Sequence, residues 1–89
     1  MKNLSEFSST IRMFAFLIKD GYSVSRAVEI LAQQSTGDIG KMFSKASAML
    51  KTGTSTADAF ASAGFPKELC AIASVGEKSG YMAEALELY

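Results

Sequence analysis

Apolar residues recur every three or four positions along the chain, and this spacing restricts the fold more than any other feature. The first series has intervals of 3, 4, 3 and 4 residues and consists of Leu4, Phe7, Ile11, Phe14 and Ile18. Because a helix makes one turn in about 3.6 residues, the series marks one face of an amphipathic helix, which we expect at about 4–20. No segment alternates apolar and polar residues for long enough to predict a strand.

Further apolar series predict more helices after the first. They begin near positions 24, 39, 56, 66 and 81, and short stretches of turn-forming residues separate them. The chain has 89 residues and a single proline, so we expect one domain with few helix breakers. The sequence therefore predicts an all-α fold over 1–89, a small antiparallel bundle of about five to six short helices.

Two of the predicted corners between helices have the same composition. The segments KDGYSVSRAV (19–28) and KTGTSTADAF (51–60) each place a serine two residues after a glycine, namely Gly21 with Ser23 and Gly53 with Ser55. Glycine accepts the positive φ that ends a helix, and a serine hydroxyl caps the free N–H groups of the next one. We therefore expect two helix-turn-helix hairpins that pack face to face.

The composition argues against several classes of function. Nine basic residues balance nine acidic ones, which leaves no basic surface for nucleic acid and no polybasic patch for a membrane. There is no histidine, and Cys70 is the single cysteine, so the usual nucleophile–base pairs and an internal disulfide are excluded. The sequence also lacks a phosphate-binding Gly-Lys loop and metal-ligand spacing. It predicts a protein that is not an enzyme and binds no cofactor or metal.

The segment VGEKSGYMAEAL (75–86) places one carboxylate, Glu77, between two glycines. A catalytic acid would need a partner group, and the next acid, Glu84, lies beyond the helix break that Gly80 predicts. A structural role is favoured: Gly76 falls on the apolar stripe and lets another helix approach closely. Glu77 would then lie beside the start of the following helix, where its charge meets the positive end of the helix dipole. Contact with a partner protein remains the third possibility.

The first helix carries more aromatic residues than one face can hold. Its three phenylalanines, Phe7, Phe14 and Phe16, cannot all point the same way, so at least one is exposed and marks a subunit or partner surface. We name Phe7, Phe16 and Glu77 as candidate contacts with a partner.

Three segments, in order, resemble the type II secretion system F domain. FAFLIKDGYSVSRAVEILA is similar to its opening, and LKTGTSTADAFASAGFP is similar to its middle, which ends in Phe65 and Pro66. VGEKSGYMAEAL resembles the signature Gly-Glu-x-Ser-Gly-x-hydrophobic-x-x-x-Leu. That signature corresponds here to Gly76, Glu77, Ser79, Gly80, Met82 and Leu86.

The resemblance implies an inner-membrane platform protein of type II secretion or type IV pilus assembly. Such proteins are scaffolds that link a cytoplasmic assembly ATPase to the assembly of pilin subunits, and no catalysis is attributed to them. The chain would be a cytoplasmic domain trimmed before a membrane-spanning segment, and the apolar surface left at its last helix would favour a homodimer. Thr56 departs from the family, which usually has leucine there, so the fourth helix is expected to be less firmly anchored.

A second hypothesis is that the chain is a helical adaptor protein unrelated to secretion. The two similar corners lie 32 residues apart, a period typical of helical repeats such as TPR. A free-standing helical adaptor, TPR-like or chaperone-like, would bind peptides in a groove. The absence of a TPR-like Trp-Leu-Gly-Tyr pattern argues against it.

Overall fold

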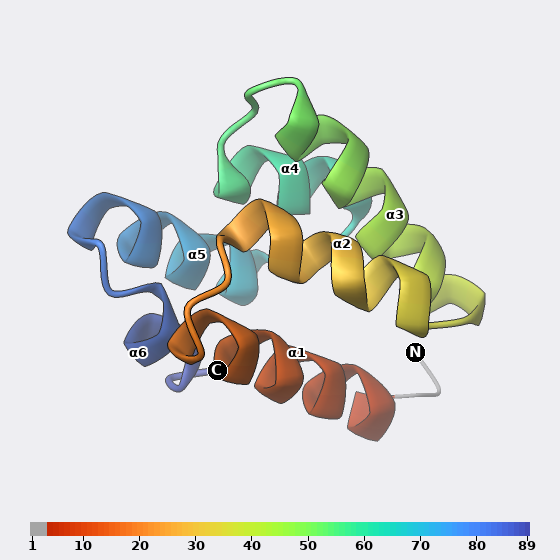
Figure 1. The fold of residues 1–89 in the computed structure, drawn as a ribbon, viewed down its shortest axis with the longest axis horizontal. Coiled ribbons are helices and arrows are strands. Elements are labelled where there is room, and N and C mark those ends of the chain that lie inside the picture. Colours follow the sequence, from red (N-terminus) through yellow and green to blue (C-terminus); the bar gives the residue numbers. More distant parts are fainter. Residues whose placement is uncertain (1–3) are drawn as a thin grey trace.

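The computed structural model describes residues 4–89, which form six α-helices and no strand (Figure 1). In chain order they are α1 (Leu4–Lys19), α2 (Val24–Gln34), α3 (Gly37–Lys51), α4 (Thr56–Ala63), α5 (Lys67–Ser79) and α6 (Met82–Leu86). The all-α bundle predicted from the apolar spacing is thereby confirmed. The last helix is shorter than the predicted segment that begins at Tyr81.

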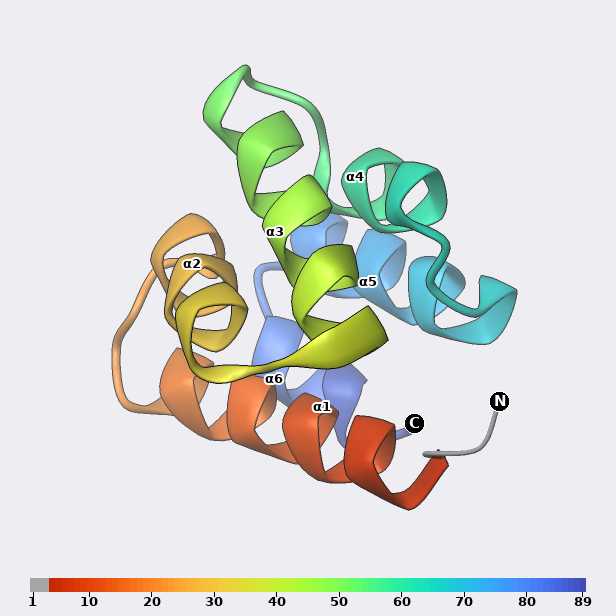
Figure 2. The ribbon, with the colours of Figure 1, turned by 90° about the vertical axis from the view of Figure 1, so that its right-hand side faces the viewer.

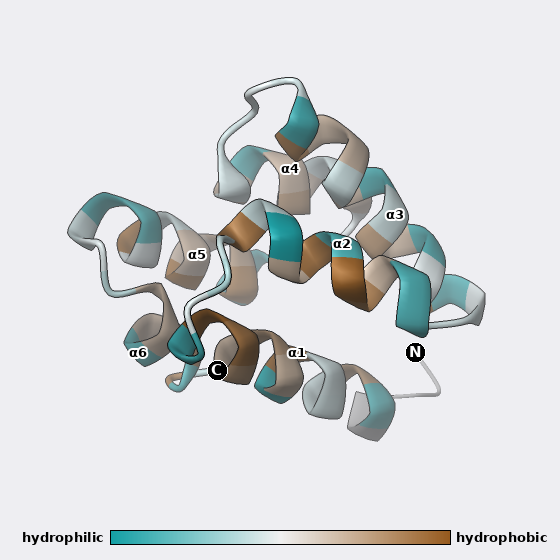
Figure 3. Cartoon of the chain, in the orientation of Figure 1, coloured by the Kyte–Doolittle hydropathy of each residue, from teal (hydrophilic) through white to brown (hydrophobic). Residues whose placement is uncertain are grey.

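The helices close into a ring. Each helix packs on the next one in sequence, and α6 packs on α1. α1 and α2 cross the view of Figure 1 in opposite directions, and Figure 2 shows α6 lying beside α1. Apolar and polar residues alternate in bands along α2 (Figure 3), as expected for a helix with one buried face. This closure brings the two ends of the described chain together.

The two Gly-x-Ser corners have the same backbone geometry. Gly21 has a φ of 105° and Gly53 a φ of 89°, and the residue after each donates its N–H to a carbonyl five residues back, at 3.1 and 3.3 Å. This is the hydrogen-bond pattern of a Schellman helix end. The hydroxyls of Ser23 and Ser55 then accept the third N–H of the next helix, at 3.1 and 3.2 Å. The same pair of local interactions, a glycine helix end followed by a serine cap, therefore forms both corners.

Phenylalanines from three helices and one loop form the centre of the core. Phe60 stacks on Phe65 with ring centroids 4.3 Å apart, and it meets Phe14 edge-on at 5.8 Å. Phe65 meets Phe7 and Phe43 edge-on, at 5.7 and 5.1 Å. All five side chains are buried. Through this cluster α1, α3 and α4 pack against the loop that leads into α5.

Candidate functional site

The Glu77 carboxylate caps the start of α4. Both of its oxygens lie 3.0 Å from the backbone nitrogen of Thr56, and Oε2 also accepts the Thr56 hydroxyl at 2.7 Å. Thr56 is the first residue of α4, so a negative charge meets the positive end of that helix and takes up one of its free N–H groups. The Ser55 hydroxyl takes up another, that of Asp58.

The sequence predicted this kind of contact but on the wrong helix. Glu77 was expected beside the helix that follows Gly80, which is α6, whereas it reaches the start of α4, 21 residues back in the chain. The last turn of α5 lies there because α4 and α5 pack together. In the turn before α6, the Ser79 hydroxyl accepts the N–H of Tyr81 at 3.1 Å, and no side chain of the described residues caps α6 itself.

Thr56 is the point at which the chain departs from the F-domain pattern. Its side chain is buried, and its hydroxyl is hydrogen-bonded to Glu77. A hydrogen-bonded polar pair thus stands where the family usually has an apolar side chain, and the expectation of a less firmly anchored fourth helix stays a prediction. Two residues far apart in sequence supply the anchor together.

The chemical groups near this junction are engaged in structural contacts. The Glu77 oxygens hold Thr56, and burial raises the pKa of the Cys70 thiol, which disfavours the reactive thiolate. Residues 4–89 contain no cluster of three or more Cys, Asp or Glu side chains that could hold a metal ion. In the same part of the chain no helix has the length and apolar character needed to cross a bilayer.

Replacing Glu77 by alanine is expected to lower the free energy of unfolding by about 1–2 kcal/mol, the usual cost of losing a helix cap. Glu77→Gln should lose less, because an amide oxygen still accepts one N–H. Denaturant unfolding measures both variants, and Lys78→Ala, at the exposed neighbouring position, is the control. Equal stability of Glu77→Ala and the parent would contradict the cap.

Gly76 lies where α5 touches α6. A Cβ atom built on it would lie 2.8 Å from the Cα and Sδ atoms of Met82 and 3.2 Å from the Cβ of Ala85. The glycine at this position therefore permits the close approach that the sequence predicted. Gly80, four residues on, ends α5 with a φ of 83°.

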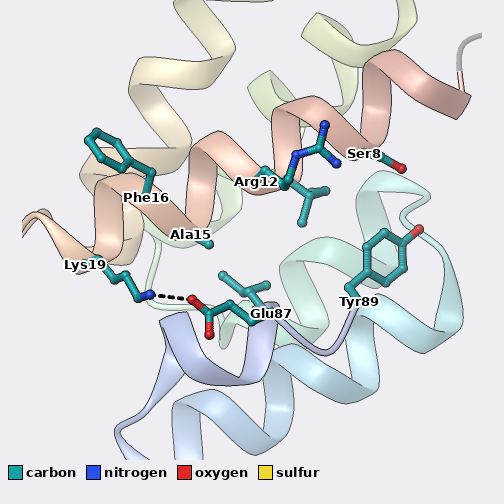
Figure 4. A pocket seen from close by; sticks show the side chains of 9 residues that line it. Ser8, Arg12, Ala15, Phe16, Lys19, Glu87 and Tyr89 are labelled. Atoms are coloured by element: carbon teal, nitrogen blue, oxygen red, sulfur yellow. Dashed lines mark hydrogen bonds and ion pairs between the residues drawn. The ribbon is translucent and has the colours of Figure 1, made fainter.

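An open groove lies between α1 and the C-terminal segment. It has a volume of about 500 Å³ and is lined by Ser8, Ile11, Arg12, Ala15, Phe16, Lys19, Leu86, Glu87 and Tyr89 (Figure 4). An ion pair between Lys19 and Glu87 links the two walls. Most of the lining surface is apolar. Such a surface suits contact with an apolar side chain of another protein.

The structure separates the three candidate partner contacts. Phe16 lies on the groove and is 61% exposed, so it is available to a partner. Phe7 is 1% exposed and packs against Phe65 and Tyr89, so its assignment as a partner contact is wrong. Phe7 belongs to the apolar stripe that faces the core, whereas Phe16 lies between stripe positions and points outward. The carboxylate of Glu77 is occupied by Thr56.

Comparison with protein-family models matches residues 10–89 to the family described as Type II secretion system (T2SS), protein F. A search of curated proteins found no match, and a search of solved structures found none either. The match spans all but the first nine of the 89 residues and includes both corners and the Gly76–Gly80 segment. The chain belongs to the type II secretion system protein F family.

Proposed function

We propose that this chain is a non-enzymatic scaffold domain of a platform protein in bacterial type II secretion or type IV pilus assembly. In this role it links the cytoplasmic assembly ATPase to the assembly of pilin or pseudopilin subunits, at the cytoplasmic face of the inner membrane. The observation that carries the proposal is the family match over 10–89. This match favours the scaffold over the free-standing peptide-binding adaptor.

The surface chemistry is consistent with a scaffold. The most conspicuous acid, Glu77, holds two helices together, and its contacts are those of a cap. The groove offers an exposed aromatic side chain, Phe16, beside an apolar floor. The partners that we propose for the chain, on the ground of its family, are the assembly ATPase, other inner-membrane components of the machinery and a second copy of the chain.

The proposal is tested by measuring binding between this chain and the purified assembly ATPase of the same organism. We expect saturable binding by calorimetry, and no hydrolytic or transfer activity of the chain alone. An activity that Glu77→Ala removes, while circular dichroism shows the fold intact, would overturn the scaffold assignment. Absence of binding to the ATPase and to every other purified component of the machinery would overturn it as well.

A further inference from the structure

Residues 81–89, which we call the C-terminal strap, have few polar links to the rest of the fold. The backbone hydrogen bonds of the strap stay within it, as between the N–H of Ala85 and the carbonyl of Tyr81 at 3.0 Å. In the part of the chain that the structure describes, one ion pair joins the strap to α1, that of Lys19 with Glu87 (Figure 4). Both side chains are more than half exposed, and exposed ion pairs contribute little to stability. Packing therefore decides whether the strap stays in place.

The strap is ordered by its contacts with α1 and α5. Met82 and Leu86 belong to the apolar core, and Met82 lies directly against Gly76 of α5. The ring of Tyr89 meets that of Phe7 edge-on, with centroids 6.3 Å apart. α6 itself has five residues and no side-chain cap, and helices shorter than about 12 residues are marginal on their own. A strap that leaves these contacts therefore loses its helix as well.

The contacts that hold the other five helices together do not involve the strap. The phenylalanine cluster is formed by α1, α3, α4 and the loop before α5. The Glu77 carboxylate joins α5 to α4 through Thr56. From α1 to α5, each helix also packs on the next. Removing the strap opens the ring of helices and leaves all of these contacts intact.

We propose that the strap opens and closes as a unit while α1–α5 stay folded, with Gly80 as its hinge. Gly80 has a φ of 83°, and a Cβ atom built on it would have no neighbouring segment within 4 Å, so packing does not restrain the turn. Leu86, Glu87 and Tyr89 line the groove from the strap, so the groove is complete only when the strap is closed. A partner that contacts both walls holds the strap closed, and loosening the strap weakens that partner's binding in turn.

Native-state hydrogen exchange, followed by NMR at low urea concentrations, tests the opening. The chain is kept dilute enough to be monomeric. We expect the protection factors of the Ala85 and Glu87 amides to be at least about ten-fold lower than those of Val28 and Phe60 in the core. Their dependence on urea should also be weaker, because opening the strap exposes less surface than global unfolding. Equal protection with equal urea dependence would show that the strap unfolds only with the whole domain, which overturns the inference.

Two variants separate an independent strap from a single cooperative unit. Ser55→Ala removes the cap of α4, which is present whether the strap is open or closed. It should lower the protection of the core amides about five-fold and leave that of the strap unchanged. Leu86→Ala weakens only the closed state and should lower the protection of both sets, by about ten-fold or more.

The other outcomes of this pair of variants contradict the strap. If Ser55→Ala lowers the protection of both sets by the same factor, the strap and the core open together. If Leu86→Ala leaves the strap amides unchanged, the strap does not pack as the structure shows. The inference goes beyond the proposed function, because these measurements use the chain alone and do not depend on its role as a scaffold.

Discussion

Phe60→Ala is expected to lower the free energy of unfolding by about 3–5 kcal/mol, the typical cost of removing a buried phenylalanine ring. Phe60 is fully buried, stacks on Phe65 and meets Phe14 edge-on. Its removal leaves a cavity at the centre of the bundle, which the neighbouring rings of Phe14 on α1 and Phe65 in the loop before α5 cannot fill without moving their backbone. Because small domains are stable by only about 5–15 kcal/mol, the variant should lie close to the unfolding threshold.

Urea denaturation followed by circular dichroism measures this loss, at a protein concentration low enough to keep the chain monomeric. Phe16→Ala is the matched control, because the same side chain is truncated at an exposed position of α1. It should change the stability by no more than about 0.5 kcal/mol. If Phe60→Ala also changed it this little, the ring cluster would not be the main core of the domain.

The helices could be predicted from sequence because their signals are local. A period of three to four residues selects a helix, and a glycine followed by a serine two residues later ends one helix and caps the next. Both Gly-x-Ser corners form in this way, with Gly21 and Gly53 at positive φ. Each signal depends on residues within one or two turns of each other, so no knowledge of the tertiary structure was needed.

The sequence also indicates which side chains of α1 face the core, although the prediction of partner contacts did not take this into account. Phe7 belongs to the same apolar series as Ile11 and Phe14, which are buried in the core, so its burial follows from the spacing alone. Phe16 falls between Phe14 and Ile18 of that series and therefore points away from the core. Naming both phenylalanines as partner contacts ignored this difference in phase.

Contacts between distant segments could not be read from the sequence. Glu77 and Thr56 are 21 residues apart, and no local pattern tells which helix start a carboxylate at the end of α5 will reach. The groove is formed by residues even farther apart in the sequence. Lys19 and Glu87 are 68 residues apart and become neighbours only when α6 packs on α1. Both features follow from the closure of the ring of helices, which local periodicity does not encode.

Gly76→Val is expected to lower the free energy of unfolding by about 3 kcal/mol, at the upper end of the usual cost of overpacking a core. A Cβ at this position would lie 2.8 Å from the backbone Cα of Met82, which cannot move without shifting α6. Valine adds two methyl groups to that clash. The small gain in helix propensity on replacing glycine, below 1 kcal/mol, does not offset it.

Thermal and urea unfolding measure the loss, and Ala71→Val, at an exposed position of α5, gives the cost of valine without the clash. The double variant Gly76→Val with Met82→Ala identifies its source. Removing the Met82 sulfur relieves one of the two 2.8 Å contacts, so the combined loss should be smaller than the sum of the single losses by about 1 kcal/mol. Strict additivity, or a Gly76→Val variant as stable as Ala71→Val, would show that α6 does not lie against this face of α5. In that case the groove, whose far wall includes Leu86 of α6, would lose its structural basis as well.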